Sequence, residues 1–140
     1  MPKQLTVGER LDVMELIADY ASKLESGDLD GYVDNFTPDG VFEARSGCYE
    51  GRSAIRDMVA HLYEIGQDGP GGNRHILGLP YITGADEGCA AQTYVMIASG
   101  AGDAPVHSVA QYHDRIALSG GRWRFAHRRI EPVSARAEAR

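Results

Sequence analysis

The sequence predicts an α+β fold in which three helices come first and a mostly antiparallel sheet follows. Three segments carry apolar side chains at helical spacing: residues 9–26, 29–36 and 51–66. After residue 72 the pattern changes to four runs of strand-forming residues: 73–83, 89–99, 105–118 and 122–132. Helices and strands are therefore segregated rather than alternating, which argues against parallel βαβ units. A sheet that curves around such helices would leave a pocket between the two layers.

The first helix has the clearest boundaries. Thr6 and Glu9 fit a capping box, in which each side chain accepts a hydrogen bond from the other residue's backbone amide. One face of the helix carries Val13, Leu16, Ile17, Tyr20 and Leu24. The segment Ser26-Gly27-Asp28 ends this helix, and Asp28 is placed to cap the second. The third helix has an apolar face made of Ile55, Met58, Val59 and Leu62.

Turn signals separate the remaining elements. Thr37-Pro38-Asp39-Gly40 predicts a turn before a short strand at 41–44. The segments GADEG, GAGDA and SGG between the later runs are predicted hairpin loops. Pro80 lacks an amide donor and therefore predicts a sheet edge or a bulge within the first run. We expect one domain over residues 1–134 and a frayed tail at 135–140.

Composition narrows the function classes. The 140 residues carry a net charge of −6, which disfavours binding to nucleic acid. The chain has no apolar run of membrane-spanning length and no apolar signal region, so we expect a soluble, cytoplasmic protein that binds no membrane. Cys48 and Cys89 match no metal-site spacing and are expected to be reduced thiols. The sequence has no glycine-rich phosphate loop and no metal-binding histidine pattern, so we expect no cofactor and no metal.

His75 is the strongest candidate functional residue. It lies in an apolar strand run, on the same face as Leu77. If this face lines the pocket, the imidazole needs a hydrogen-bond partner. A carboxylate such as Glu25, at the end of the first helix, would fix the ring tautomer and leave the other nitrogen free as a base. The alternatives are a packed structural histidine and a solvated Glu25.

Two further side chains are candidates for the same pocket. Tyr20 lies on the apolar face of the first helix, where its ring would be buried and its hydroxyl would stay in contact with water or a ligand. Arg128 and Arg129 lie on opposite sides of the last strand, so one of them lines the pocket unless a bulge intervenes. A pocket arginine would stabilise an anionic group, and the alternative is a surface salt bridge.

Four segments together resemble the SnoaL-like branch of the nuclear-transport-factor-2-like superfamily. They are ADYASKLESGDLDGYVDNFTPDGVFE, YEGRSAIRDM, NRHIL and GGRWRFAHRRI. The resemblance extends from about Thr6 to Pro132. It implies a cone-shaped, curved antiparallel sheet packed on the three helices around a deep pocket. It also implies a homodimer formed through the outer face of the sheet.

Three enzymes of this superfamily resemble the chain in one particular respect. Scytalone dehydratase, bile acid 7α-dehydratase and hexachlorocyclohexane dehydrochlorinase combine a first-helix carboxylate with a histidine early in the sheet. The resemblance places Glu25 and His75 at these positions, although the carboxylate in those enzymes is usually Asp. It places Tyr20 at a position that contacts substrate. Arg128, or alternatively Arg129, matches a functional arginine of the dehydrochlorinase.

The resemblance also implies substrate-binding positions. A catalytic polar residue of some members lies on the second strand of the sheet, where Gln92, Thr93 and Tyr94 are the candidates. We expect Gln92, Tyr94 and Trp123 to contact substrate.

The implied function is a cofactor-independent lyase or isomerase of the dehydratase type, acting on an apolar cyclic small molecule. His75 would remove a proton from carbon while Glu25 orients the imidazole. Tyr20 would polarise a carbonyl or assist a leaving hydroxyl, and Arg128 would help to hold negative charge. One alternative is a ligand-binding module or structural subunit without chemistry of its own. Another is an enzyme resembling polyketide cyclases or epoxide hydrolases, in which a carboxylate acts on substrate or water.

Overall fold

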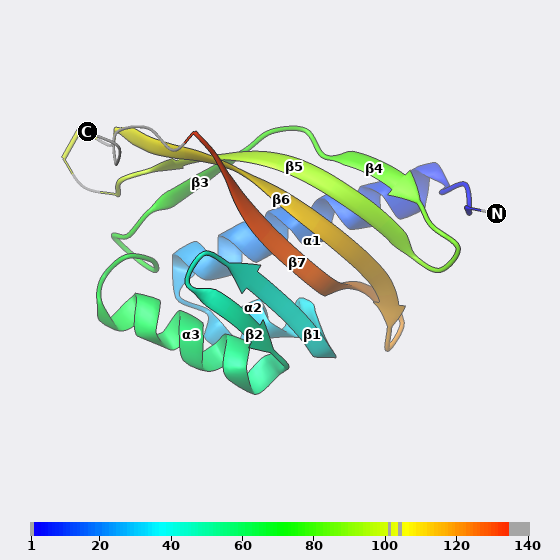
Figure 1. Cartoon of the computed structure of the whole chain (residues 1–140), viewed down its shortest axis with the longest axis horizontal. Helices are drawn as coiled ribbons and strands as arrows, with labels where there is room; N and C mark the ends of the chain where they lie inside the picture. The colour runs from blue at the N-terminus through cyan, green and yellow to red at the C-terminus, as the bar shows by residue number, and fades with distance from the viewer. Residues whose placement is uncertain (1, 101, 104, 135–140) are drawn as a thin grey trace.

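The computed structural model describes residues 2–100, 102–103 and 105–134 (Figure 1). Within these ranges it has three helices: α1 (Val7–Ser26), α2 (Leu29–Asp34) and α3 (Arg52–Glu64). The strands are β1 (Phe36–Ala44), β2 (Gly47–Glu50), β3 (Arg74–Leu77), β4 (Tyr81–Gly84), β5 (Cys89–Ala98), β6 (Val106–Ser119) and β7 (Arg122–Ser134). The predicted α+β fold is confirmed, and the frayed tail predicted at 135–140 lies outside the described residues.

The strands form one curved, mixed sheet in the order β2-β1-β7-β6-β5-β3, with β4 also paired to β5. All pairs are antiparallel except β1 with β7, which run parallel. In Figure 1, α1 passes behind the long strands β5 to β7, and α3 lies beside the β1–β2 hairpin. The helices therefore cover one face of the sheet and leave the opposite face open.

The core forms where the apolar helix faces meet the inner face of the sheet. All five apolar side chains predicted on the first helix are buried: Val13, Leu16, Ile17, Tyr20 and Leu24. The capping box between Thr6 and Glu9 is present, and Asp28 accepts a hydrogen bond from the Gly31 amide at the start of α2. The periodic apolar pattern and the caps thus set both the position and the rotation of α1.

Two predicted strand segments have different boundaries in the structure. The run 73–83 is divided into β3 and β4, both paired with β5, because Pro80 interrupts the ladder between them. The turn predicted at 37–40 is instead an irregularity within β1, whose register with β7 shifts between Phe36 and Val41. β2 was not predicted, since its four residues are too short to show a clear alternation.

A bulge in β7 decides which side chains of this strand enter the core. Trp123 and Phe125 are buried, and strict alternation would next bury His127. The register with β6 shifts between Phe125 and His127, so Arg128 is buried instead and His127 faces outward. The same shift leaves Arg129 on the outer face, in a groove that it shares with His113 and His127.

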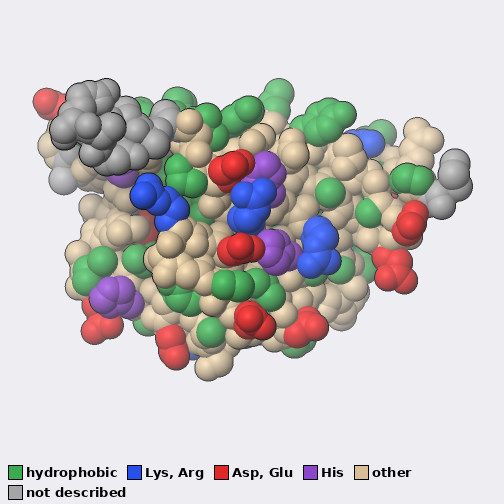
Figure 2. Space-filling model, viewed as in Figure 1, with side chains coloured by type: hydrophobic (Ala, Val, Ile, Leu, Met, Phe, Trp, Pro, Cys, Tyr) green, Lys and Arg blue, Asp and Glu red, His purple; other side chains and the backbone are tan. Residues whose placement is uncertain are grey.

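The open face of the sheet carries charged side chains at its centre (Figure 2). His113 lies 2.8 Å from Glu131, and His127 lies 3.1 Å from Glu43. Exposed apolar side chains occur on β3, β4 and β5, namely Ile76, Tyr81, Tyr94 and Met96. Dimer formation through this face stays a prediction. No helix within the described ranges is long and apolar enough to cross a membrane.

Candidate functional site

A cavity of about 440 Å³ lies between the helices and the inner face of the sheet. Most of its wall is apolar, contributed by residues such as Leu24, Phe42, Met58 and Ile130. Its polar lining residues are Tyr20, Tyr32, Ser46, Tyr49, His61, Gln67, Asp68, Asn73, His75 and Tyr112. A largely apolar cavity with convergent polar groups is the usual form of a small-molecule site.

The structure brings His75 and Glu25 together although they are 50 positions apart in sequence. Nδ1 of the imidazole lies 3.1 Å from Oε2 of Glu25, and the same oxygen accepts the backbone N–H of His75 at 2.5 Å. The His75 side chain is 7% exposed. A carboxylate offers only acceptors, so Nδ1 carries the proton and the lone pair of Nε2 is left toward the cavity.

The end of α1 explains how Glu25 reaches the imidazole. The helix stops at Gly27, which adopts a left-handed conformation with φ of 83°. Glu25 therefore lies in the last turn of α1, beside the first residues of β3. With its side chain only partly exposed, the carboxylate turns toward His75 instead of extending into water.

Asp68 is a cavity residue that the sequence analysis missed. Its Oδ1 atom lies 3.8 Å from Nε2 of His75, on the side of the ring opposite Glu25. Asp68 is 6% exposed, and Oδ1 has no hydrogen-bond partner among the described residues. Burial raises the pKa of this carboxyl, and the nearby Glu25 carboxylate adds to the rise. The positive form of His75 and a hydrogen bond from Gln67 oppose it.

A compact loop between α3 and β3 holds Asp68 in this position. The Gln67 amide donates to the Leu62 carbonyl at 3.0 Å, and the Asn73 amide donates to the Gln67 carbonyl at 2.8 Å. In sequence, an aspartate between glycines and a proline is typical of a solvent-exposed turn. In the sequence, the only feature that connects Asp68 with the candidate site is its position seven residues before His75.

Gly72 should be essential to this loop. A Cβ atom at this position would lie 2.7 Å from the Asp68 Cα, so Gly72→Ala must displace the backbone that carries the carboxyl. We expect urea denaturation to show a loss of about 1–3 kcal/mol in the free energy of unfolding. Gly78→Ala is the matched control, because its Cβ would meet nothing closer than 3.5 Å. Equal stability of the two variants would contradict this account of the loop.

Tyr20 contributes a neutral hydroxyl to the cavity. Its oxygen accepts a hydrogen bond from the Tyr32 hydroxyl at 2.7 Å. Burial raises the pKa of Tyr20 well above its ordinary value, so the phenol remains protonated. Each hydroxyl of this pair can donate or accept, so the Tyr20 proton can go either to Tyr32 or to another acceptor in the cavity.

Arg128 enters the core but does not line the cavity. Its guanidinium donates to both carboxylate oxygens of Asp114, at 2.8 and 3.2 Å. It also stacks on the rings of Tyr112 and Tyr20, at 3.6 and 4.2 Å from their centroids. Both rings line the cavity, so they separate the charge from a ligand. This corrects the expectation that Arg128 holds substrate charge directly.

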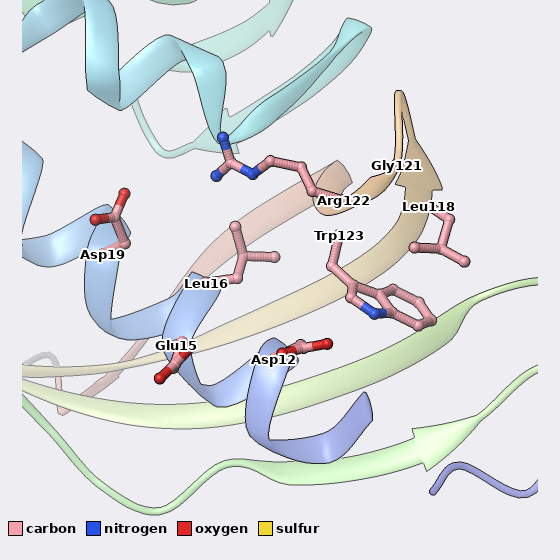
Figure 3. A pocket seen from close by; sticks show the side chains of 8 residues that line it. All are labelled: Asp12, Glu15, Leu16, Asp19, Leu118, Gly121, Arg122 and Trp123. Carbon is pink, nitrogen blue, oxygen red and sulfur yellow. The ribbon is translucent and has the colours of Figure 1, made fainter. Parts of the chain in front are cut away.

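The three predicted substrate-binding residues lie away from His75. Thr93 is fully buried, so Gln92 and Tyr94, its neighbours on β5, face the outer side of the sheet. Trp123 is buried at the start of β7 and lines a separate pocket of about 600 Å³ (Figure 3). That pocket also contains Asp12, Glu15, Asp19 and Arg122. Sequence alternation could not decide which face of β5 points inward.

The remaining candidate metal ligands are dispersed. His107, His113 and His127 lie outside the cavity, on β6 and β7. Cys48 is exposed and Cys89 is buried, both as free thiols as predicted. Among the residues that the structure describes, no group of three or more His, Cys, Asp or Glu side chains is arranged to hold a metal ion.

Solved structures of similar fold cover almost the whole chain. A Nostoc punctiforme protein of unknown function with a cystatin-like fold is 22% identical, with 95% of this chain and 97% of that chain aligned and a TM-score of 0.84. Aln2 from a Streptomyces species is 18% identical over 99% and 100% of the two chains, with a TM-score of 0.81. A Catenulispora acidiphila structure in complex with S-DNPA is 24% identical over 91% and 95%, with a TM-score of 0.80.

These likenesses are below 25% identity and establish the fold alone. A comparison with curated proteins found no match. The profile of the SnoaL-like domain family, in contrast, matches residues 6–129, which include α1, the cavity loop and most of the sheet. The chain therefore belongs to the SnoaL-like domain family.

Proposed function

We propose that the protein is a cofactor-independent lyase or isomerase of the dehydratase type, acting on an apolar cyclic ketone. Membership of the SnoaL-like family and an apolar cavity support a small-molecule binding or enzymatic role. The contact between His75 and Glu25 at the edge of this cavity supports the more specific proposal of a lyase or isomerase. A buried imidazole held by a carboxylate is the usual arrangement of a general base.

In the proposed reaction His75 removes a proton from the carbon next to the substrate carbonyl. The Nδ1–H group donates to Glu25, so the proton from carbon goes to Nε2. The Glu25 carboxylate then stabilises the imidazolium that forms. Glu25 replaces the usual Asp of the enzymes that the chain resembles, and its longer side chain still reaches the ring because α1 ends at the next residue, Ser26.

Tyr20, which lines the same cavity, would assist this step by donating to the substrate carbonyl oxygen. Negative charge develops on that oxygen as the carbon loses its proton, and a hydrogen bond that strengthens at this stage lowers the barrier. The hydroxyl of Tyr32 donates to Tyr20 and thereby orients it. A largely apolar wall lowers the local dielectric, which would strengthen both contacts.

Solvent deuterium exchange tests the proposal without knowledge of the natural substrate. A cyclic β-hydroxyketone, β-hydroxycyclohexanone, is incubated in D₂O, and proton NMR follows the loss of the signal from the carbon next to the carbonyl. We expect the protein to accelerate this exchange, and Glu25→Ala to slow it by about 10²-fold or more because the imidazole loses its orienting partner.

Glu15→Ala is the matched control, since Glu15 is an exposed carboxylate on the same helix. It should exchange at the wild-type rate. If the wild-type protein binds the ketone and gives no exchange above the buffer rate, the base assignment fails. The cavity would then be that of a ligand-binding module.

A further inference from the structure

The proposed base leaves one buried ionisable group of the cavity without a role. We propose that Asp68 is the general acid of the same site and that the substrate is a β-hydroxy carbonyl compound, whose hydroxyl leaves with a proton from Asp68. This inference rests on the proposed function, because it assigns the second half of an elimination that His75 begins.

Asp68 lies close enough to His75 for both side chains to act on one substrate molecule. Oδ1 and Nε2 are 3.8 Å apart, too far for a direct hydrogen bond but on one side of the cavity. A base and an acid this close can reach a hydrogen and a hydroxyl on neighbouring carbons of one molecule. Both groups must then lie on the same face of the substrate, so the geometry selects loss of water from one face.

The surroundings of Asp68 leave part of its carboxyl group unsatisfied. The Oδ1 atom is buried without a partner among the described residues, which is costly unless a ligand or a proton satisfies it. The loop that carries it is closed by backbone hydrogen bonds, such as Gly72 N–H to Gly69 C=O at 2.9 Å, and not by this oxygen. A purely structural role therefore leaves the atom unexplained.

Burial favours the neutral form of Asp68. The groups that interact electrostatically with it are His75, Glu25, Gln67 and the phenols of Tyr20, Tyr32, Tyr63 and Tyr112. Burial and the Glu25 carboxylate both raise the pKa of Asp68, against the opposing effects of His75 and Gln67. A protonated carboxyl next to a neutral imidazole is the starting state that an acid–base pair requires.

The protons and electrons of this cycle balance. The C–H bond next to the carbonyl breaks, its proton goes to Nε2 of His75, and its electron pair forms the C=C bond. The C–O bond of the neighbouring carbon breaks, and its electron pair leaves on the oxygen, which takes the Asp68 proton and departs as water. The imidazolium then returns its proton to the Asp68 carboxylate through the water just released, because the 3.8 Å between the two atoms is too long for direct transfer. The site is restored without an external acid or base.

The test separates the two halves of the reaction on one probe, β-hydroxycyclohexanone. Deuterium exchange reports on the base, and formation of cyclohexenone, followed by its ultraviolet absorbance, reports on the acid. In Asp68→Asn the ratio of elimination to exchange should fall by about 10²-fold, since the amide fills the same space but is a poor acid. Asp57→Asn, at an exposed position of α3, should leave both rates at wild-type values.

Equal rates of elimination in Asp68→Asn and wild type would overturn the acid assignment, and so would a parallel loss of both rates, which indicates a structural role. If the wild-type protein itself catalysed neither exchange nor elimination, the proposed function would be overturned instead. A substrate-free measurement then decides on Asp68 alone. Carboxyl ¹³C NMR should show Asp68 still protonated above the ordinary carboxyl pH range, and ionisation of Asp68 within that range would refute the inference.

Stability gives a second substrate-free readout. The folded protein retains the Asp68 proton to a higher pH than the unfolded chain, so ionisation of this group lowers stability as the pH rises past the ordinary carboxyl range. Asp68→Asn removes that penalty. Its melting temperature should exceed that of wild type at neutral pH, and the difference should vanish at acidic pH, where both side chains are neutral. A lower melting temperature at neutral pH would contradict the raised pKa.

Discussion

Replacing His75 by Gln is expected to reduce enzyme-catalysed deuterium exchange by about 10² to 10⁴-fold, the usual contribution of a positioned general base. Glutamine retains a backbone N–H for Glu25 and fills much of the space of the imidazole, but its amide cannot accept a proton at neutral pH. The loss should therefore appear in the rate constant of exchange more than in the affinity for the ketone, which NMR titration measures separately.

A histidine on the outer face of the sheet provides the control. His113→Gln removes an imidazole that pairs with Glu131, remote from the cavity, and should exchange at the wild-type rate. Circular dichroism of both variants should match wild type. Undiminished exchange in His75→Gln would show that another group, such as Asp68, is the base.

Replacing Arg128 by Met is expected to cost about 3–5 kcal/mol in the free energy of unfolding. Arg128 and Asp114 have fully buried side chains, joined by two hydrogen bonds. Removal of the guanidinium leaves a buried carboxylate without its partner, which is far more costly than loss of a surface ion pair. The guanidinium also contacts the rings of Tyr20 and Tyr112, so their packing should loosen as well.

Urea denaturation of Arg128→Met and Arg129→Met measures this effect directly. Arg129 is the next residue but lies in the groove on the outer face, so its replacement should change stability by less than about 0.5 kcal/mol. Adding Asp114→Leu to Arg128→Met should recover much of the loss, because an apolar pair often substitutes well for a buried ion pair. Similar stabilities of the two single variants would contradict the inward orientation of Arg128.

The helical half of the molecule was predictable from local patterns. The apolar face of α1 and the caps at Thr6 and Asp28 depend on residues within a few positions of one another. The same locality placed His75 on a strand and Glu25 at a helix end. That the two meet required the family resemblance, since nothing local connects residues 50 positions apart.

The sheet was less predictable because its side-chain orientations depend on pairing. One bulge in β7 reverses the expected roles of His127 and Arg128, and it is visible only in the register with β6. The same limitation applied to Gln92 and Tyr94, which alternation alone could not assign to the outer face of β5. Trp123 is buried on the inner side of the sheet, but it lines a different pocket from the one that contains His75.

By itself, the sequence determined the fold class, the extent of the helices and the pair of residues proposed as base and orienting group. The fold class and the helices follow from short-range periodicity and capping, whereas the pairing of His75 with Glu25 came from the family resemblance. Only the tertiary structure decided that Asp68 faces His75 and that Arg128 pairs with Asp114 behind the cavity wall. The physical reason is that an aspartate in a loop or an arginine in a strand can be stable either exposed to water or buried beside a partner. Only the packing of the sheet against its helices selects between these two environments.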